Sequence, residues 1–261
     1  MRMNYRTQKQ VIIFFTTFIF LGLALLVFAL IFSGKPKPSP PPLTGEESVE
    51  TPKVVFKDIE VISSNLVAIE GREKIYDIIA EIKNPNLEYG SPSFVYEFVF
   101  KDQAGAETKR LSGTSFVLAN QTRYLIKQAI RLPADPFSVE LNILSQTWKR
   151  LAPFESSGLK IGDLKIRRDN ELGNTYVSGL VHNRTPYNLR EVDINIVLYL
   201  PGATGKENII AAGATNIQLL NRGDTRSFQI LWPSILPYVD MDAKVESNFF
   251  ENDNFIRDYA L

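Results

Sequence analysis

Residues 78–84 read IIAEIKN, and residues 177–183 read VSGLVHN, 99 positions later. Small residues coincide at Ala80 and Gly179, and asparagines coincide at Asn84 and Asn183. In both stretches apolar and polar residues alternate, which is typical of a β-strand with one face on a core. The pair therefore predicts one β-structured unit that occurs twice in the chain.

The correspondence extends outward on both sides of this strand. The matching segments, first copy before second, are residues 56–61 with 161–166, 94–100 with 192–198, Thr122-Arg123 with Thr225-Arg226, and 139–143 with 241–245. A repeat of this length is a duplicated domain, not a solenoid unit. Roughly six or seven short strands with turns in each copy indicate an antiparallel sandwich of immunoglobulin or fibronectin type. We therefore predict an all-β fold of two tandem sandwiches, residues 53–152 and 153–250, followed by a C-terminal tail, residues 251–261.

A long apolar segment precedes the repeat. Residues 11–32 read VIIFFTTFIFLGLALLVFALIF and contain no charged side chain. A helix of this length extends roughly 33 Å, enough to cross the hydrocarbon core of a bilayer. A cleaved signal peptide would have a shorter apolar stretch and small residues at its end, whereas this segment ends Ala29-Leu30-Ile31-Phe32. We predict a transmembrane helix that anchors the protein in the lipid bilayer.

The flanks of this helix predict its orientation. Arg2, Arg6 and Lys9 precede it, and Lys35 and Lys37 follow it. The small excess of positive charge before the helix favours a cytoplasmic N-terminal tail, residues 1–10, and extracytoplasmic C-terminal domains. Residues 33–52 include six prolines. A proline-rich linker in extended geometry reaches up to roughly 60 Å and spaces the domains from the membrane.

The strand motifs resemble the FxLYD domain and its wider group, which includes water-stress-hypersensitivity domains. That group has a V-x-G-x-V-x-N pattern, matched by Val177, Gly179, Val181 and Asn183, and conservatively by residues 78–84. Its F-x-L-Y-D strand is split, since residues 98–102 read FVFKD and residues 196–200 read IVLYL. The resemblance covers core and turn positions and implies an envelope module without enzymatic activity.

Composition narrows the chemistry further. The chain has 29 basic and 29 acidic residues and no cysteine. The balance argues against nucleic-acid binding, and the missing cysteines remove thiol nucleophiles and thiolate metal sites. His182 is the only histidine, and zinc usually takes several such ligands. Ser157-Gly158-Leu159-Lys160 matches S-x-x-K but lacks the companion motifs of that chemistry. We predict no catalytic, cofactor-binding or metal residue, no cofactor, no small-molecule substrate and no enzyme activity.

Several polar residues have both a functional and a structural interpretation. Asn84 and Asn183 could contact a ligand, but strand-end asparagines usually satisfy neighbouring backbone groups. Asp58 and Asp163 are interpreted as turn or bulge positions. The acidic pairs Asp240/Asp242 and Glu251/Asp253 lack the spacing of a calcium loop and are expected on a solvated surface.

The leading functional hypothesis is a non-enzymatic, single-pass membrane protein of the cell envelope. Its sandwiches would bind a protein partner through loops such as residues 63–74 and 201–208, or through strand edges. The alternative is an accessory or assembly subunit of an envelope machine, such as a secretion or pilus system, in which the transmembrane helix itself makes contacts.

Overall fold

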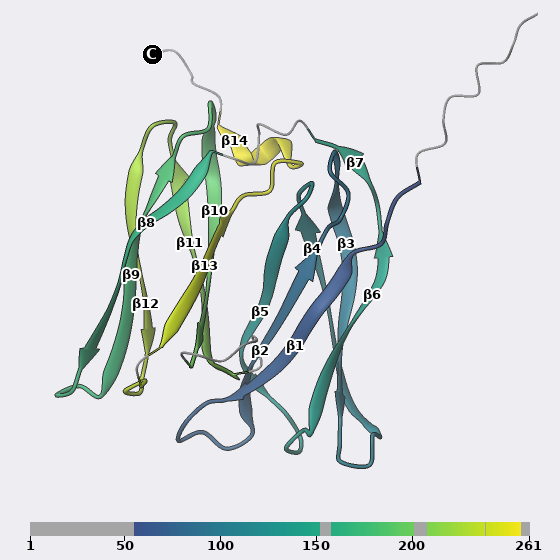
Figure 1. The fold of residues 1–261 in the computed structure, drawn as a ribbon, viewed down its shortest axis with the longest axis vertical. Coiled ribbons are helices and arrows are strands. Elements are labelled where there is room, and N and C mark those ends of the chain that lie inside the picture. Colours follow the sequence, from purple (N-terminus) through teal and green to yellow (C-terminus); the bar gives the residue numbers. More distant parts are fainter. Residues whose placement is uncertain (1–54, 152–157, 201–207, 238, 257–261) are drawn as a thin grey trace, which may run out of the picture. The chain divides into compact units, whose positions relative to one another are not determined.

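The computed structural model describes residues 55–151, 158–200, 208–237 and 239–256. They all belong to one compact unit, Val55–Leu261. Apart from one 3-10 turn, their regular elements are β-strands in antiparallel sheets, so the all-β fold class is confirmed (Figure 1). None of the described residues forms a helix with the length and hydrophobicity needed to span a membrane. The predicted N-terminal tail, transmembrane segment and linker, residues 1–52, lie outside the described residues.

The first half of the unit is a β-sandwich of two sheets. Its strands are β1 (Glu60–Ala68), β2 (Ile75–Lys83), β3 (Tyr89–Lys101), β4 (Glu107–Val117), β5 (Thr122–Arg131), β6 (Ser138–Gln146) and β7 (Lys149–Arg150). One sheet has the order β1-β2-β5, and the other has the order β4-β3-β6 with β7 also paired to β3. Phe94, Phe98 and Phe100 of β3 pack against Ile78 and Ile82 of β2 to form the core between the sheets.

The second half repeats this topology strand by strand. Its elements are β8 (Leu159–Asp169), β9 (Asn174–Asn183), β10 (Asn188–Tyr199), β11 (Ile209–Leu220), β12 (Thr225–Trp232), β13 (Asp240–Glu246), the 3-10 turn η2 (Asn252–Asn254) and β14 (Phe255–Ile256). The sheets have the orders β12-β9-β8 and β11-β10-β13. β14 pairs with the start of β10, as β7 pairs with the start of β3. Residues 255–256, placed in the tail by the sequence analysis, therefore belong to the second sheet.

Strand registers confirm most of the predicted correspondence. Phe98 pairs with Leu141, and Ile196 pairs with Ala243. Likewise Ile82 pairs with Arg123, and Val181 pairs with Arg226. The predicted match of residues 56–61 with 161–166 is wrong. β1 begins at Glu60, and Val61 faces Ile82 as Ile161 faces Val181. The patterns around Asp58 and Asp163 are similar but out of structural register, because Ile161 is equivalent to Val61 and not to Phe56.

Burial differs sharply between the equivalent strands β2 and β9. In β9 buried and half-buried residues alternate, as predicted for a strand with one face on a core. In β2 every residue from Asp77 to Ile82 is buried, so the prediction of one buried face is wrong there. Ile78, Ala80 and Ile82 face the core of the first sandwich, whereas Ile79 faces a separate cluster that includes residues of β10 and β11. Strands covered on both faces lose their alternation.

Candidate functional site

The second face of β2 contacts the other sandwich through an apolar cluster. Ile79 of β2 and Tyr124 of β5 pack with Val197 of β10 and Ala212 of β11, and all four are buried. The Tyr124 hydroxyl donates a hydrogen bond to Asp242 Oδ2 at 2.7 Å. The sheet β1-β2-β5 therefore lies face to face with the sheet β11-β10-β13. We call this contact the inter-sandwich interface.

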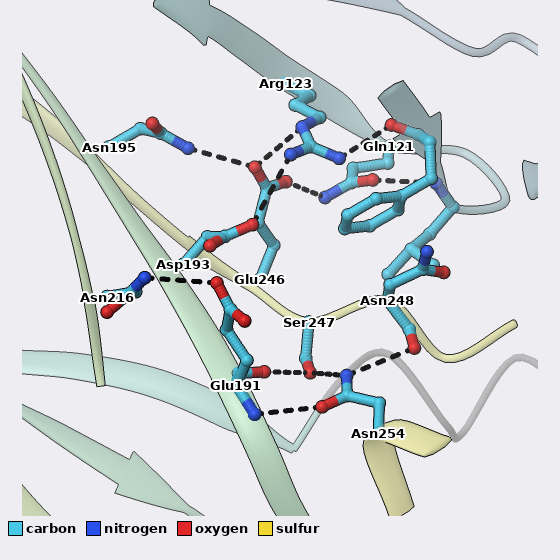
Figure 2. Close-up of polar contacts among 12 residues, drawn as sticks. Gln121, Arg123, Glu191, Asp193, Asn195, Asn216, Glu246, Ser247, Asn248 and Asn254 are labelled. Carbon is cyan, nitrogen blue, oxygen red and sulfur yellow. Dashed lines mark hydrogen bonds and ion pairs between the residues drawn. The ribbon is translucent and has the colours of Figure 1, made fainter. Parts of the chain in front are cut away.

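A buried ion pair lies at the edge of this interface (Figure 2). Arg123 Nε, at the start of β5, is 2.8 Å from Glu246 Oε1, at the end of β13. The Arg123 Nε–H has no hydrogen-bond acceptor at a suitable angle. Its Nη1 donates to the Phe116 carbonyl at 2.7 Å, and its guanidinium carbon lies 3.8 Å from the centre of the Phe116 ring. Asp193 Oδ2 is 3.6 Å from Nη2. Arg123 is thus fixed by one sandwich and neutralised by acids of the other.

Glu246 accepts further hydrogen bonds from both sandwiches. Gln121 Nε2 donates to Oε2 at 2.6 Å, and Asn195 Nδ2 donates to Oε1 at 3.0 Å. Only 2% of Glu246 is exposed. Burial is the largest effect and raises the pKa of Glu246 to about 7, although Arg123 and the two amide donors oppose the shift. Burial likewise raises the pKa of Asp193. The interface therefore includes carboxyl groups that resist ionisation.

A second polar network fastens η2 beneath this ion pair (Figure 2). Asn254 Nδ2 donates to Ser247 Oγ at 2.7 Å, and Ser247 Oγ donates to the Glu191 carbonyl at 2.6 Å. The Glu191 amide donates to Asn254 Oδ1 at 2.9 Å. All these groups belong to the second sandwich, so the network orders the end of its chain against β10. Phe249 and Phe255 contact each other and the core of this sandwich.

A polar cavity of about 440 Å³ opens beside the ion pair. Arg123, Arg190, Asp193, Glu191 and Glu251 all contribute to its wall. Charges of both signs line it, and the acids, which include Asp253, outnumber the arginines. Within the described ranges, no group of three or more His, Cys, Asp or Glu side chains converges on a point where a metal ion could be held.

Asn84 and Asn183 are structural residues, as predicted. Asn84 Nδ2 donates to the carbonyls of Tyr89 and Leu118 at 2.7 and 2.8 Å. Asn183 Nδ2 donates to the equivalent carbonyls of Tyr187 and Leu220 at 2.8 and 3.0 Å. Each Oδ1 accepts a backbone N–H two residues later. Both amides close the turn between the second and third strands of their sandwich.

The other predicted positions lie apart from the interface. His182 is half-buried on β9, and its Nδ1 lies 2.8 Å from Thr225 Oγ1. Asp163 has a positive φ of 52° in the bulge of β8, which confirms the bulge prediction. Asp58 lies before β1 and accepts a hydrogen bond from Gln146. Ser157 of the S-x-x-K match lies outside the described residues.

Two expectations about surface segments need correction. Asp242 is not on a freely solvated surface, because it is half-buried and accepts the Tyr124 hydroxyl at the interface. Asp240, Glu251 and Asp253 are exposed, as predicted.

The first half of the proposed loop of residues 63–74 is strand, since β1 continues to Ala68. Residues 201–207 of the other proposed loop lie outside the described residues.

The residues that join the sandwiches were not predicted from the sequence. In the sequence, Arg123 is the counterpart of Arg226 and has the pattern of an ordinary repeat position. Gln121 and Glu246 are 125 residues apart, and no local pattern connects them. The one available signal was Ile79, because an apolar residue on the face opposite Ile78 and Ala80 departs from alternation and indicates a strand buried on both faces.

Comparison with known proteins adds no family. No family model matches this sequence, and no curated protein matches it either. The resemblance to the FxLYD group therefore stays a prediction, and the function is argued from the described residues.

Proposed function

We propose that this chain is a non-enzymatic, membrane-anchored protein of the cell envelope that presents two β-sandwiches as one rigid body to a protein partner. The anchor is residues 11–32, the spacer is residues 33–52, and the sandwiches lie on the extracytoplasmic side. We propose further that each sandwich is of the immunoglobulin or fibronectin type and belongs to the FxLYD-like group.

The observation that carries this proposal is the inter-sandwich interface. Two domains on a flexible tether usually meet through polar, solvated contacts. Here an apolar cluster around Ile79 and Val197 lies beside the buried Arg123–Glu246 ion pair. A desolvated ion pair is costly unless its geometry is maintained. An interface of this kind supports a fixed orientation of the two domains, which a recognition module needs and a simple spacer does not.

The strand order supports the immunoglobulin-like assignment. In immunoglobulin folds the first, second and fifth strands share one sheet, and the third and sixth share the other. The order β1-β2-β5 with β3-β6 follows this arrangement, and the order β8-β9-β12 with β10-β13 repeats it. The fourth strand of each copy departs from the seven-strand pattern and pairs with the third.

Exposed apolar residues indicate where a partner binds. The turns after β1, β5, β8 and β12 lie at the end of the sandwiches opposite β7 and β14 (Figure 1). Phe137 in the turn after β5 is 70% exposed, and Leu172 in the turn after β8 is 67% exposed. Loops at one end of a sandwich are a common recognition surface.

Site-specific photo-crosslinking in intact cells tests this proposal. A photoreactive residue at Phe137 or Leu172 should capture a protein partner. Leu87 is a matched control because it is 69% exposed but lies in the turn after β2, at the opposite end. Failure of both test positions to capture a protein, or equal capture from Leu87, would contradict recognition through these loops.

Two cell-based measurements address the membrane part of the proposal. External protease should degrade the sandwiches in intact cells if they are extracytoplasmic, and protection would contradict the orientation. Replacing residues 11–32 with an unrelated anchor should preserve partner capture. Loss of capture after this replacement would favour the alternative, an assembly subunit whose transmembrane helix makes contacts.

A further inference from the structure

A second cleft lies at the other edge of the inter-sandwich interface, and it differs in character from the polar cavity. Its volume is about 410 Å³, and residues of both sandwiches line it. Val67 of β1, Ile210 of β11, Trp232 of β12 and Leu236 provide an apolar wall. Asp77 of β2 lies in the same wall. A largely apolar cleft of this size with few polar groups has the character of a small-molecule site.

Asp77 is buried without a cationic partner. It is 6% exposed. The only hydrogen bond to its carboxylate from the described residues comes from the Ala129 backbone N–H, which donates to Oδ1 at 2.9 Å. No lysine or arginine among those residues forms an ion pair with it. Burial is the main reason that the pKa of Asp77 is raised. A buried carboxylate with one hydrogen bond is costly.

A β-bulge in β5 of the first sandwich lies opposite Asp77 at the cleft. Tyr76 pairs with Ile130 and Ile78 pairs with Lys127, so two residues of β5 lie opposite Asp77. One of them, Ala129, has a positive φ of 53°, which is unfavourable for a residue with a Cβ. In the second sandwich the pairing of β9 with β12 is unbroken from Thr175 to His182. The bulge is therefore not needed to build this type of sandwich, and it occurs where the cleft is.

We propose that this cleft binds an organic ammonium cation with an apolar body. The Asp77 carboxylate would neutralise the ammonium group, and the Trp232 indole would contact the cation or its apolar body. Tryptophan is the best aromatic partner for a cation, and a carboxylate in an apolar cleft adds charge specificity. The exposed charges of Glu70 and Arg72 at the rim balance each other, so the Asp77 carboxylate gives the cleft one more acid than bases. This proposal does not depend on the proposed protein partner.

A simpler role for Asp77 is to cap the bulge by accepting the Ala129 N–H. Asp77→Asn separates the two roles, because the asparagine Oδ1 still accepts that hydrogen bond but carries no charge. Glu70→Gln is the matched control, since it removes an acid from the rim of the same cleft. Arg72→Ala tests the sign of the ligand, because removing a cation should strengthen cation binding and weaken anion binding.

The experiment titrates the full-length protein in detergent with 2-phenylethylammonium and with its neutral counterpart 2-phenylethanol. The chain has two tryptophans, so Trp148→Phe leaves Trp232 as the only indole reporter. We expect the ammonium to change the Trp232 fluorescence at a concentration at least tenfold lower than the alcohol. Asp77→Asn should weaken ammonium binding by about ten- to a hundredfold, as for loss of a charged hydrogen bond. Glu70→Gln should weaken it less than about threefold, because exposed charges contribute little.

Three results would overturn the proposal. One is equal response to the ammonium and the alcohol in the protein with native Asp77, a comparison that requires no change in the cleft. Another is unchanged ammonium binding by a folded Asp77→Asn protein, which would leave Asp77 with the capping role alone. The third is weaker ammonium binding by a folded Arg72→Ala protein, because removal of a nearby positive charge should strengthen the binding of a cation.

Discussion

Asn84 and Asn183 make the same hydrogen bonds in the two sandwiches, whereas Arg123 and Arg226 differ although they occupy equivalent strand positions. Each asparagine donates to two backbone carbonyls within its own sandwich. Arg123 is buried and ion-paired with the other sandwich, while Arg226 is exposed and donates to the Leu219 carbonyl. Contacts that build each sandwich are thus shared by the two copies. The differences concentrate where one copy contacts the other.

The same contrast occurs between whole strands. β2 and β9 are equivalent in topology, yet β2 is buried on both faces and β9 alternates. Ile79, on the second face of β2, belongs to the apolar cluster between the sandwiches, and Asp77 lines the cleft beside it. Substituting equivalent residues in the two copies therefore separates the stability of a sandwich from the stability of the interface.

Among equivalent positions, alanine substitution of Arg123 and Arg226 is expected to give the largest difference in the free energy of unfolding. Arg123→Ala leaves Glu246 and Asp193 as buried acids without their cation, so the free energy of unfolding at pH 8 should fall by about 3–5 kcal/mol. Arg226→Ala removes an exposed side chain and should cost less than about 0.5 kcal/mol. Urea unfolding of both variants measures the difference. Equal losses would show that the Arg123 ion pair contributes no more than a surface contact.

The buried carboxyl groups should make the interface sensitive to pH. The pKa of Glu246 is raised from 4.5 to about 7 in the folded protein, so between these values the folded chain keeps a proton that the unfolded chain releases. Stability should therefore fall as the pH rises through this window, by roughly 2–4 kcal/mol. Asp193 contributes in the same direction.

Glu246→Gln isolates this effect. The variant cannot ionise, so its stability should vary much less between pH 4.5 and 7, the window set by Glu246. Chemical unfolding at several pH values measures both profiles. A native profile that rises with pH through this window would contradict the burial of an ionisable Glu246.

Alanine substitution of Asn84 and of Asn183 is expected to lower the free energy of unfolding by equal amounts. Asn84→Ala leaves the Tyr89 and Leu118 carbonyls without their donor, and Asn183→Ala does the same to Tyr187 and Leu220. Each change should cost about 2 kcal/mol, because buried acceptors lose their hydrogen bonds. Asn142→Ala, at an exposed position of β6, is the control and should be nearly neutral. Unequal losses, measured by urea unfolding, would contradict the shared structural role.

The smallest effect is expected at the bulge that only the first sandwich has. Ala129 has a positive φ, so Ala129→Gly should stabilise the protein by up to about 1 kcal/mol. Gln229 of β12 lies in the unbulged counterpart of β5, opposite Ser178, and Gln229→Gly should destabilise by a similar amount. Thermal unfolding of the two variants should therefore shift in opposite directions. A shift in the same direction would show that the Ala129 backbone is not strained.

The parts of this structure that depend on hydrogen bonds between residues close in sequence could be predicted from the sequence. Asn84 and Asn183 were assigned correctly because a strand-end amide bonds to groups a few residues away in its own sandwich. The strand registers followed from alternation in residues 94–100 and 192–198. Arg123 and Glu246 were not predictable, since their environment depends on how two complete sandwiches pack. Asp77 was missed for the same reason, because its cleft exists only after docking.

We infer that the inter-sandwich interface joins the two sandwiches into one rigid body. The chain has no cysteine, so two introduced cysteines can be labelled uniquely. Asn142 on β6 and Lys165 on β8 are exposed and lie on different sandwiches. A double electron–electron resonance measurement between spin labels at Asn142→Cys and Lys165→Cys, on the full-length protein in a lipid nanodisc, should give one narrow distance distribution. A broad or multiple distribution would show that the sandwiches move independently and would contradict the claim.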